Sequence, residues 1–319
     1  MDLEAFLAEW QNDSPTLLVH TSGSTGKPKP LLVEKHRMQA SARITCEFLG
    51  LKEGDKALLC MPLDYIAGKM MVVRALQWHL QLIVVEPCGH PLKALSEHVD
   101  FAAMVPLQVY NSLQVPEERE RLMQIGNLII GGGAIDQEMA DELRAFPHPV
   151  WSTYGMTETL SHIALRRLSG PQASEWYTPF PTVSVSLSAD GCLVIDAPQV
   201  CSQRLVTNDI AELRDDGCFR IKGRKDNVIC SGGLKIQIEE VERLLKPHLD
   251  GEYMITKRKD ERLGEAVVLL TTLPEANARA VCEQVLPKHW RPRFYIQTDR
   301  LPLTETGKPA RYEAERMAQ

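Results

Sequence analysis

The segment from Thr21 to Lys29 is rich in the residue types that bind phosphate. Glycine lets backbone N–H groups approach a phosphate closely, and hydroxyl side chains donate further hydrogen bonds. A Walker loop would need Ser or Thr directly after Gly-Lys and then a helix, whereas Pro28 and Pro30 surround Lys29 here. Because apolar runs flank the segment, we expect a phosphate-binding loop between two strands and not a flexible linker. Its candidate ligands are Thr21, Ser22, Gly23, Ser24, Thr25, Gly26 and Lys29.

A second group of motifs lies between residues 130 and 159. A glycine-rich run reads Ile130-Gly-Gly-Gly-Ala134, and Tyr154-Gly-Met-Thr-Glu-Thr159 follows a further apolar run. Magnesium takes one or two carboxylates together with phosphate oxygens. The single acid Glu158, at the end of a predicted strand, suits that role, although a lone acid in a turn is more often simply solvated.

Two charged residues further along the chain are candidates for ligand binding. Asp209, in Thr207-Asn-Asp209, can accept two hydrogen bonds at once, which suits a vicinal diol. Lys308 lies in the segment Leu301-Pro-Leu-Thr-Glu-Thr-Gly-Lys-Pro309, close to the C-terminus. Taken alone, Asp209 would be interpreted as a hairpin acid and Lys308 as a solvated turn lysine.

In this order, the motifs resemble those of the adenylate-forming superfamily, which includes acyl- and aryl-CoA synthetases, adenylation domains and luciferases. The resemblance extends from about Thr16 to Arg311 and includes His36, which follows the phosphate loop. It implies that the protein is an enzyme, an acid–thiol ligase that activates a small carboxylic acid as an acyl-AMP and passes the acyl group to a thiol. The implied ligands are ATP, Mg²⁺ and coenzyme A.

The resemblance also implies a role for each motif residue. Lys308 would neutralise charge while a carboxylate attacks the α-phosphorus, Thr157 would contact the α-phosphate, and Glu158 would bind Mg²⁺. Asp226 resembles the hinge about which the C-terminal domain of the family rotates. The implied nucleotide contacts are Gly132, Gly133, Ala134, Tyr154, Gly155, Asp209 and Arg224, and the implied CoA contacts are Gly232 and Gly233.

The segments expected to line an acyl pocket contain Tyr65, Gly68, Lys69 and Pro106. With the GGGAI and SGGLKIQIEEVE runs, they most resemble the o-succinylbenzoate–CoA ligases of menaquinone synthesis, including a compact bacterial form.

That acid carries a second carboxylate, which needs a cation or several donors when it is buried. The candidates are Lys69, Arg74 and His162, although Lys69 and Arg74 could equally be solvated helix residues. Some such ligases place a cation just after the VPxQ segment, where Asn111 and Ser112 stand here.

The motifs are distributed over alternating strands and helices. Apolar periodicity predicts helices at residues 3–10, 35–49 and 91–99. The alternation of strands and helices up to about residue 165 favours an α/β fold with a parallel sheet. Short alternating runs separated by Asp-Gly turns at residues 176–225 favour a small antiparallel barrel or sandwich.

We therefore expect two domains. Residues 1–225 would bind AMP and the acyl group, and residues 226–319 would form a small mobile α+β domain that carries the catalytic lysine. Family members usually have a subdomain-sized segment before the phosphate loop, but only about 20 residues precede it here. The resemblance therefore implies an adenylate-forming fold that is shortened at its N-terminus.

Composition argues against several classes of protein. The net charge of −6 gives no support to a nucleic-acid partner, and no apolar run approaches the roughly 18 residues that span a bilayer. Eight cysteines without a CxxC pair indicate reduced thiols and a cytoplasmic location. Cys88 and His90 could form half of a metal site, but no second half follows at ligand spacing.

Two other functions are compatible with the motifs. One is a free-standing aryl or amino-acid adenylation enzyme that serves a carrier protein. The other is a nucleotide-binding homologue that has lost catalysis, a hypothesis motivated by the short N-terminal segment. Glu158, Asp209, Arg224 and Lys308 argue against the second function, because a sensor would not need the adenylation lysine.

Overall fold

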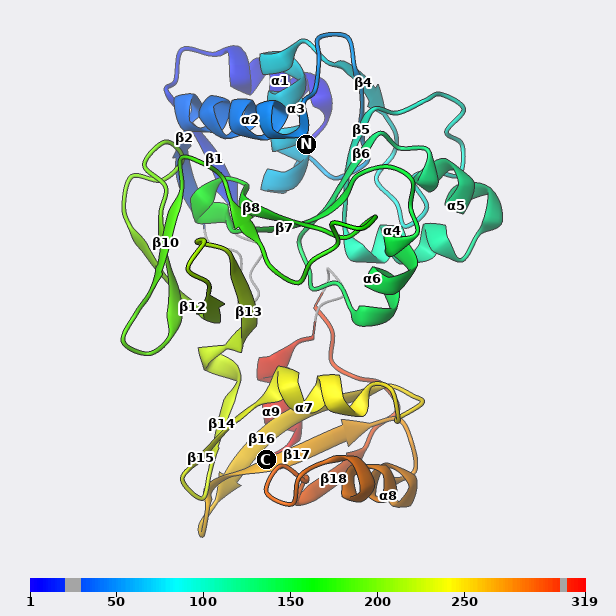
Figure 1. Cartoon of the computed structure of the whole chain (residues 1–319), viewed down its shortest axis with the longest axis vertical. Coiled ribbons are helices and arrows are strands. Elements are labelled where there is room, and N and C mark those ends of the chain that lie inside the picture. The colour runs from blue at the N-terminus through cyan, green and yellow to red at the C-terminus, as the bar shows by residue number, and fades with distance from the viewer. Residues whose placement is uncertain (21–29, 305–308) are drawn as a thin grey trace.

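The computed structural model describes residues 1–20, 30–304 and 309–319 (Figure 1). They form an α/β unit, at the top of Figure 1, and a smaller α+β unit below it. Several predicted site residues lie outside the described residues, namely Thr21, Ser22, Gly23, Ser24, Thr25, Gly26, Lys29 and Lys308.

The largest sheet among the described residues has seven strands and carries the central motifs. Five of these strands run parallel, as the alternation of strands and helices predicted, and β8 and β9 then extend the sheet in antiparallel fashion. In spatial order the strands are β4 (Gln81–Val84), β3 (Lys56–Leu59), β5 (Phe101–Met104), β6 (Asn127–Ile130), β7 (Val150–Gly155), β8 (His162–Arg167) and β9 (Thr178–Pro179).

The two strands that flank the predicted phosphate loop do not join this sheet. β1 (Thr16–His20) and β2 (Pro30–Glu34) pair with each other in antiparallel register, with Thr16 opposite Glu34 and His20 opposite Pro30. Both strands were predicted correctly, and they form a separate two-stranded sheet. A connection as short as residues 21–29 permits antiparallel pairing, whereas parallel neighbours need a longer crossover.

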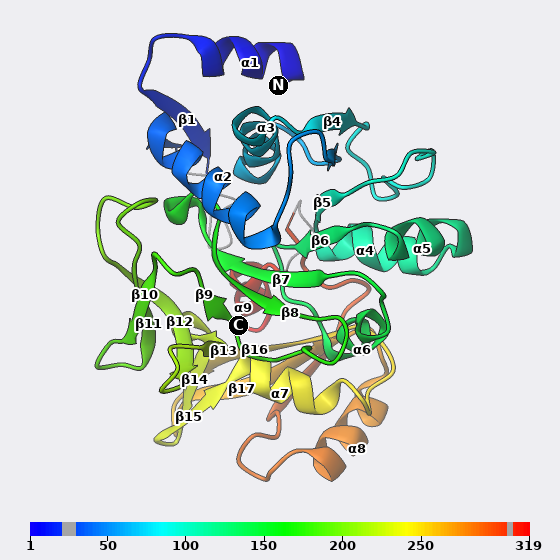
Figure 2. The same cartoon turned by 45° about the horizontal axis from the view of Figure 1, so that its top comes forward.

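Helices cover both sides of the seven-stranded sheet (Figure 2). One group lies with the N-terminus and the other lies beyond β5 and β6, which is the arrangement expected when the strand order reverses at β3. The first group is α1 (Leu3–Gln11), α2 (Lys35–Leu49) and α3 (Ile66–Trp78), and the second is α4 (Pro106–Leu113), α5 (Pro116–Met123) and α6 (Gln137–Arg144). No helix in the described ranges is long and apolar enough to cross a membrane.

The helix predicted at residues 91–99 is not formed. This segment consists of turns and bends, although Leu92 and Leu95 are buried as the periodicity required. The side chain of Arg121 on α5 donates hydrogen bonds to the carbonyl oxygens of Leu92 and Lys93, at 3.0 and 2.9 Å. The carbonyl oxygen of Leu92 also accepts from Leu95 N at 3.2 Å, so the backbone forms a turn here, held by a tertiary contact, in place of the predicted helix.

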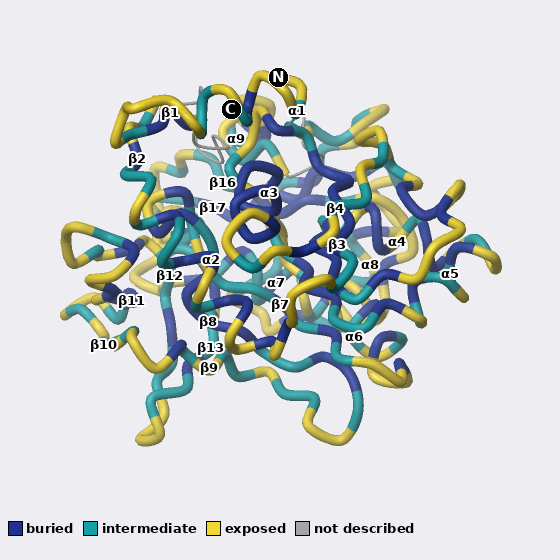
Figure 3. The backbone as a smooth tube through the Cα atoms, turned by 90° about the horizontal axis from the view of Figure 1, so that it is seen from above, coloured by how far each residue is buried: buried dark blue, intermediate teal, exposed yellow. Residues whose placement is uncertain are grey.

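Helix α3 is enclosed by protein over most of its length. Its residues from Gly68 to Ala75 are all buried, and Figure 3 shows the helix as a buried coil among its neighbours. A helix buried on all sides is normally apolar all round. Two cations, Lys69 and Arg74, nevertheless lie within this stretch, at 3% and 2% exposure. The alternative that they are solvated helix residues is therefore wrong.

The region expected to be a small barrel or sandwich is one antiparallel sheet within the described residues. Its strands, in spatial order, are β10 (Ser184–Leu187), β11 (Cys192–Asp196), β12 (Leu205–Leu213) and β13 (Phe219–Arg224). Leu193, Ile195 and Phe219 belong to the same hydrophobic core as the seven-stranded sheet. The antiparallel sheet is thus part of the larger unit.

The smaller unit has a sheet with helices on both faces. Alternate residues of neighbouring strands point to opposite faces, so Ile255 and Leu269 pack with α7 and α8, whereas Met254 and Leu270 pack with α9. Its elements are η2 (Lys225–Asn227), β14 (Val228–Ser231), β15 (Leu234–Gln237), α7 (Ile238–Leu245), β16 (Tyr253–Asp260), β17 (Gly264–Thr271), α8 (Glu275–Val285), β18 (Phe294–Gln297) and α9 (Arg311–Met317).

Polar contacts connect the two units. Lys246 Nζ, just after α7, lies 2.8 Å from Oδ2 of Asp136, the residue that caps α6. Gln237 Nε2 donates to the carbonyl oxygen of Arg224 at 2.9 Å. The division predicted between residues 225 and 226 falls inside η2, and independent motion of the two units stays a prediction.

Candidate active site

The Tyr154–Thr159 motif forms a tight turn at the carboxyl end of β7. β7 ends at Gly155, a single 3₁₀ turn η1 (Thr157–Thr159) follows, and β8 then returns beside β7. A Cβ at position 155 would lie 2.3 Å from the carbonyl oxygen of Ser161. Only glycine permits this approach, so the local packing dictates the residue type. Within η1, Thr157 is buried and Glu158 is exposed.

The tyrosine of this motif contacts the predicted ribose-binding acid. Tyr154 Oη donates a 2.6 Å hydrogen bond to Oδ2 of Asp209, on β12. The Tyr154 ring packs edge-on against Phe219, with 5.1 Å between ring centroids. Burial, and then the charge of Asp209, raise the pKa of Tyr154, which therefore stays a donor. The structure thus brings together two side chains that the sequence places 55 positions apart.

Arg224 lies beside Asp209 in the antiparallel sheet. The two residues are direct partners of β12 and β13. The guanidinium of Arg224 is turned toward Asp226, with 2.9 Å between Nη2 and Oδ2, and Asn208 Nδ2 lies 3.2 Å from the same oxygen. Asp209 and Arg224, the predicted ribose contacts, therefore lie in one polar cluster with Asp226, the predicted hinge.

The glycine-rich turn after β6 packs against the start of α4. Gly132 has φ +80°, a backbone conformation that favours glycine. A Cβ on Gly133 would come 3.3 Å from Cγ of Pro106, so the turn and the VPLQ segment lie in contact. Ala134 and Gly132 are exposed. The turn is thus available to a ligand on the side away from Pro106.

The predicted acyl pocket lies at the point where the strand order of the sheet reverses. Ligands of open α/β sheets bind outside the carboxyl ends of the strands at such points. The chain leaves β3 toward Tyr65 and α3, and it leaves β5 toward Pro106 and α4. Gln108, on α4, holds together the segments that follow these strands. Its Nε2 donates to the carbonyl oxygen of Cys60, just after β3, at 3.1 Å, and to that of Cys88, after β4, at 2.9 Å.

Two of the four predicted acyl contacts face protein. A Cβ on Gly68 would lie 2.4 Å from the carbonyl oxygen of Pro62, so this glycine permits close packing of α3. Lys69 Nζ lies 4.0 Å from Glu9 Oε2 and 5.4 Å from the centroid of the Phe6 ring, both on α1. Burial lowers the pKa of Lys69, and Glu9 opposes that effect. Contact of either residue with an acid stays a prediction.

A buried polar chain links α3, β8 and α2, and the sequence did not reveal it. Arg74 Nη2 donates to Ser161 Oγ at 2.6 Å, and Ser161 Oγ lies 3.2 Å from His162 Nδ1. His162 Nε2 lies 3.2 Å from Thr45 Oγ1. Burial lowers the pKa of Arg74 to about 10, while burial and the charge of Arg74 hold the pKa of His162 well below its ordinary value. The only sequence signal was one arginine in an apolar run, MMVVRAL.

The two predicted CoA glycines form a hairpin turn. Gly232 and Gly233 connect β14 to β15, and their φ values of +57° and +83° match a two-residue turn with both central residues left-handed. Figure 1 shows this hairpin extending away from the seven-stranded sheet. The left-handed backbone of the turn accounts for glycine at both positions. Contact of these two glycines with CoA stays a prediction.

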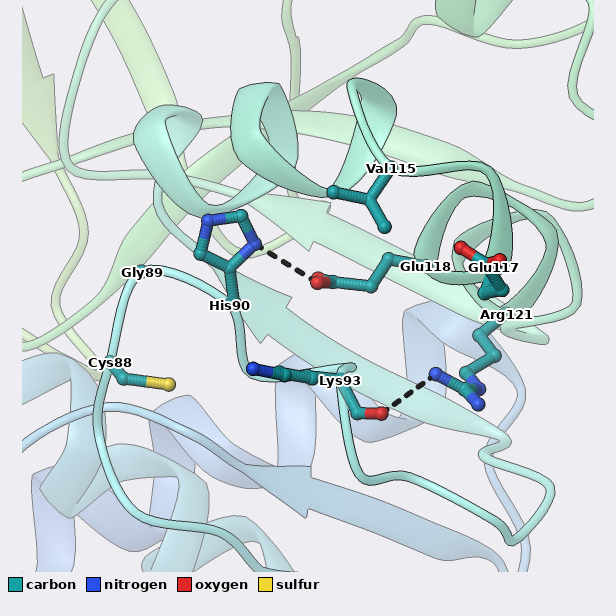
Figure 4. A pocket seen from close by; sticks show the side chains of 8 residues that line it. All are labelled: Cys88, Gly89, His90, Lys93, Val115, Glu117, Glu118 and Arg121. Atoms are coloured by element: carbon teal, nitrogen blue, oxygen red, sulfur yellow. Dashed lines mark hydrogen bonds and ion pairs between the residues drawn. The ribbon is translucent and has the colours of Figure 1, made fainter.

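A cavity with no lining residue from the nucleotide motifs lies beside the loop after β4 (Figure 4). It has a volume of about 620 Å³ and is lined by the loop after β4, by Val115 and by α5. The buried carboxylate of Glu118 reaches it, 2.9 Å from His90 Nδ1 and 3.0 Å from Ser112 Oγ. In the described part of the chain, no group of three His, Cys, Asp or Glu side chains could hold a metal ion. Among the described residues, Cys88 and His90 are therefore not part of a group of three possible metal ligands.

Comparison with known families decides the class of this site. The family described as AMP-binding enzyme matches residues 4–201. The chain belongs to the AMP-binding enzyme family. This AMP-binding enzyme is 25% identical to the 2-succinylbenzoate–CoA ligases of Listeria monocytogenes and Bacillus subtilis, over 95% and 97% of its own length and 70% and 69% of theirs.

Solved structures with the same fold are adenylate-forming enzymes. An acyl-CoA synthetase (AMP-forming)/AMP-acid ligase II-like protein from Dyadobacter fermentans is 32% identical, with 97% of this chain and 92% of that chain covered and a TM-score of 0.66. The o-succinylbenzoate CoA synthetase of Bacillus subtilis, in complex with its acyl-adenylate intermediate, gives a TM-score of 0.78 at 23% identity, over 93% of this AMP-binding enzyme and 68% of that chain. The predicted adenylate-forming fold is confirmed.

Proposed function

We propose that this AMP-binding enzyme is an ATP-dependent carboxylate–CoA ligase whose acid is o-succinylbenzoate. The ligase class is supported by family membership and by the clustering of Tyr154, Asp209 and the η1 turn at the carboxyl edge of the sheet. The Tyr154–Asp209 contact is the observation on which the nucleotide site rests. The choice of acid is supported by the two bacterial 2-succinylbenzoate–CoA ligases that align with nearly the whole chain.

In the first half-reaction, a carboxylate oxygen of the acid attacks the α-phosphorus of ATP, and pyrophosphate leaves with the bonding electrons. Asp209 would hold the ribose hydroxyls and Thr157 would contact the α-phosphate. The exposed carboxylate of Glu158 fits Mg²⁺, because that ion needs one or two carboxylates and takes its other ligands from phosphates and water. Mg²⁺ would neutralise phosphate charge, and Lys308 would supply a further positive charge to the transferring group.

In the second half-reaction, the thiol of CoA attacks the acyl carbonyl, loses its proton to water and expels AMP. The proposed rotation about Asp226 would replace Lys308 near the nucleotide by the Gly232–Gly233 turn. Support comes from the position of Asp226 in η2, between the core that includes Phe219 and the core that begins at Ile229.

The free thiols of all eight cysteines support the proposed cytoplasmic location.

ATP–pyrophosphate exchange with a panel of acids tests the proposal. A site that binds a polar group can reject an analogue lacking it by about 10⁴, so we expect exchange with o-succinylbenzoate to exceed exchange with benzoate by at least about a hundredfold. Comparable exchange with benzoate or a medium-chain fatty acid would refute the acid and leave the ligase class standing. Exchange with an amino acid would favour the carrier-protein enzyme, and no exchange with any acid would favour an inactive homologue.

A further inference from the structure

We propose that Leu160 is a positioning residue whose strained backbone conformation holds the adjoining turn η1 in the shape that binds MgATP. This inference rests on the proposed function, because it assigns nucleotide phosphate and Mg²⁺ to Thr157 and Glu158. Leu160 touches neither ligand in this assignment. It lies just after the Tyr154–Thr159 motif and begins the connection from η1 to β8.

The backbone at Leu160 forms a rare and strained turn. Leu160 has φ +67° and ψ −37°, and Ser161 N donates to the carbonyl oxygen of Thr159 at 2.7 Å. This combination of a positive φ, a negative ψ and a hydrogen bond two residues apart is close to the strained form of the γ-turn. The Cβ of a leucine makes the conformation costly, whereas glycine adopts positive φ readily.

Contacts on both sides of Leu160 explain why the strained conformation persists. Leu160 is 3% exposed and belongs to the main hydrophobic core. Thr159 Oγ1 accepts from Met156 N at 3.0 Å and lies 2.7 Å from the carbonyl oxygen of Ser161, so it bridges the two ends of the turn. Strained backbone persists only where surrounding contacts over-determine it, and it is concentrated at functional sites. The buried leucine is therefore suited to a turn that must keep one shape.

The strained turn is connected directly to the residues assigned to MgATP. Leu160 N donates to the carbonyl oxygen of Thr157 at 2.9 Å. On the other side, Gly155 leaves little room for adjustment, because a Cβ there would lie 2.3 Å from the carbonyl oxygen of Ser161. A change in the backbone torsions of Leu160 would therefore reorient the segment that carries Thr157 and Glu158.

The test compares Leu160→Ala with Leu160→Gly. Alanine keeps a Cβ but loses most of the buried anchor, so the turn should relax, and we expect the Kd for MgATP, measured by calorimetry without acid, to rise about tenfold. Glycine adopts the turn without strain, so the Kd of Leu160→Gly should stay within about threefold of the wild type. A leucine that serves burial alone predicts the opposite order, because glycine removes more apolar surface than alanine and loosens the backbone.

Leu165, on β8, and His79, at the end of α3, provide matched controls. Leu165 is 1% exposed and lies within a strand, so Leu165→Gly should unfold at a lower temperature than Leu165→Ala. At position 160 the order of unfolding temperatures should be reversed, because glycine removes the strain. His79 is the other residue besides glycine with positive φ in the described ranges, and His79→Gly should leave the Kd for MgATP unchanged.

Thr159→Val tests the same turn by a second route, and it decides the question if Leu160→Ala does not fold. It removes the hydroxyl that bridges Met156 and Ser161, so the Kd for MgATP should rise about tenfold. Thr159→Ser keeps the hydroxyl and should bind MgATP within about twofold of the wild type. Equal Kd values for Thr159→Val and the wild type would mean that these contacts do not hold the turn, and the inference would be wrong.

Weaker MgATP binding by folded Leu160→Gly than by Leu160→Ala overturns the inference. So does a lower unfolding temperature of the glycine variant, since either order is that of a side chain that is merely buried. Normal MgATP binding by the wild type with no exchange toward o-succinylbenzoate would refute only the proposed acid, and the order of the two Leu160 variants would still decide the inference. Failure of the wild type to bind MgATP would overturn both.

Discussion

The hydroxyl of Tyr154 donates a hydrogen bond of 2.6 Å to the carboxylate of Asp209. The residue assigned to the adenine and the residue assigned to the ribose therefore support one another directly. A carboxylate has about four lone-pair positions, so Asp209 can keep this donor and still accept from a ribose diol. The contact orients Asp209 before the nucleotide arrives.

We expect Tyr154→Phe to raise the Kd for ATP about tenfold, because Asp209 loses a hydrogen bond to its charged group while the aromatic ring remains. Isothermal titration calorimetry measures the change. Tyr177→Phe is the control, since its hydroxyl pairs with Ser152 Oγ at 2.8 Å and not with Asp209. Equal affinity of Tyr154→Phe and the wild type would remove Asp209 from the ribose site.

Lys308→Ala should abolish adenylation and leave thioester formation from supplied acyl-AMP largely intact. Charge builds on the transferring phosphorus only in the first half-reaction, so the ammonium is needed only there. Separate assays of pyrophosphate exchange and of acyl-CoA formation from synthetic acyl-AMP provide the comparison. Equal losses in both assays, with the fold intact, would count against a dedicated role for Lys308.

The Lys246–Asp136 ion pair should bias the protein toward the arrangement of units seen here. Its two side chains are 47% and 42% exposed, so the effect is small, and we expect Lys246→Ala to change the ratio of the two half-reaction rates by about twofold to fivefold. Lys288→Ala, on an exposed loop, should leave the ratio unchanged. An unchanged ratio in Lys246→Ala would mean that the pair does not select an arrangement.

The same pair predicts how that ratio depends on pH. Burial opposes ionisation of Asp136, but hydrogen bonds from Lys246 and from the backbone of Met139 outweigh it and lower the pKa below the ordinary 3.8. The pair is therefore complete above that value and is lost only as the pH falls through the lowered pKa. Between about pH 5 and 8, the difference between Lys246→Ala and the wild type should stay constant. A difference that disappears within this window would show that another group titrates.

The smaller unit should depend on the pair formed by Arg311 and Glu242. Both guanidinium Nη atoms lie 2.7 Å from the Glu242 carboxylate, and Arg311 Nη1 also donates to the carbonyl oxygen of Ile255. The side chains are 23% and 22% exposed, so we expect Arg311→Met to lower the free energy of unfolding by about 2 kcal/mol, less than for a fully buried pair. Urea denaturation measures it.

Arg316→Met provides the comparison, because its ion pair with Glu313 is largely exposed and should contribute less than about 0.5 kcal/mol. Similar losses in the two variants would show that burial does not strengthen the Arg311 pair.

Sequence patterns predicted the structure correctly where local conformational preferences and tertiary packing agree. The helix predicted at residues 35–49 is α2, with Gly50 in the left-handed conformation at its end. The order of the nucleotide motifs also predicted that Tyr154 and Asp209 belong to one site. The hydrogen bond between the two side chains could not be predicted from the sequence. Pairing between residues so far apart depends on how β7 and β12 pack, and no local pattern encodes that arrangement.

Sequence reasoning was wrong or undecided where contacts between distant residues determine the structure. Arg121 donates to two carbonyls within residues 91–99, where the structure has turns and not the predicted helix. For Lys69 and Arg74 the sequence left a pocket position and a solvated position equally open, and the structure buries both side chains. Their partners Glu9 and Ser161 lie on other elements, so only the assembled fold identifies them.

Gly68 and Gly155 limit how the predicted acyl pocket can be redesigned. In each case a Cβ would meet a backbone carbonyl oxygen, at 2.4 Å from Pro62 and 2.3 Å from Ser161, so no flexible side chain can move aside. Mutant libraries that aim to accept other acids should keep both glycines fixed. Tyr65 and Leu107 are better positions to vary, because their side chains are 37% and 56% exposed.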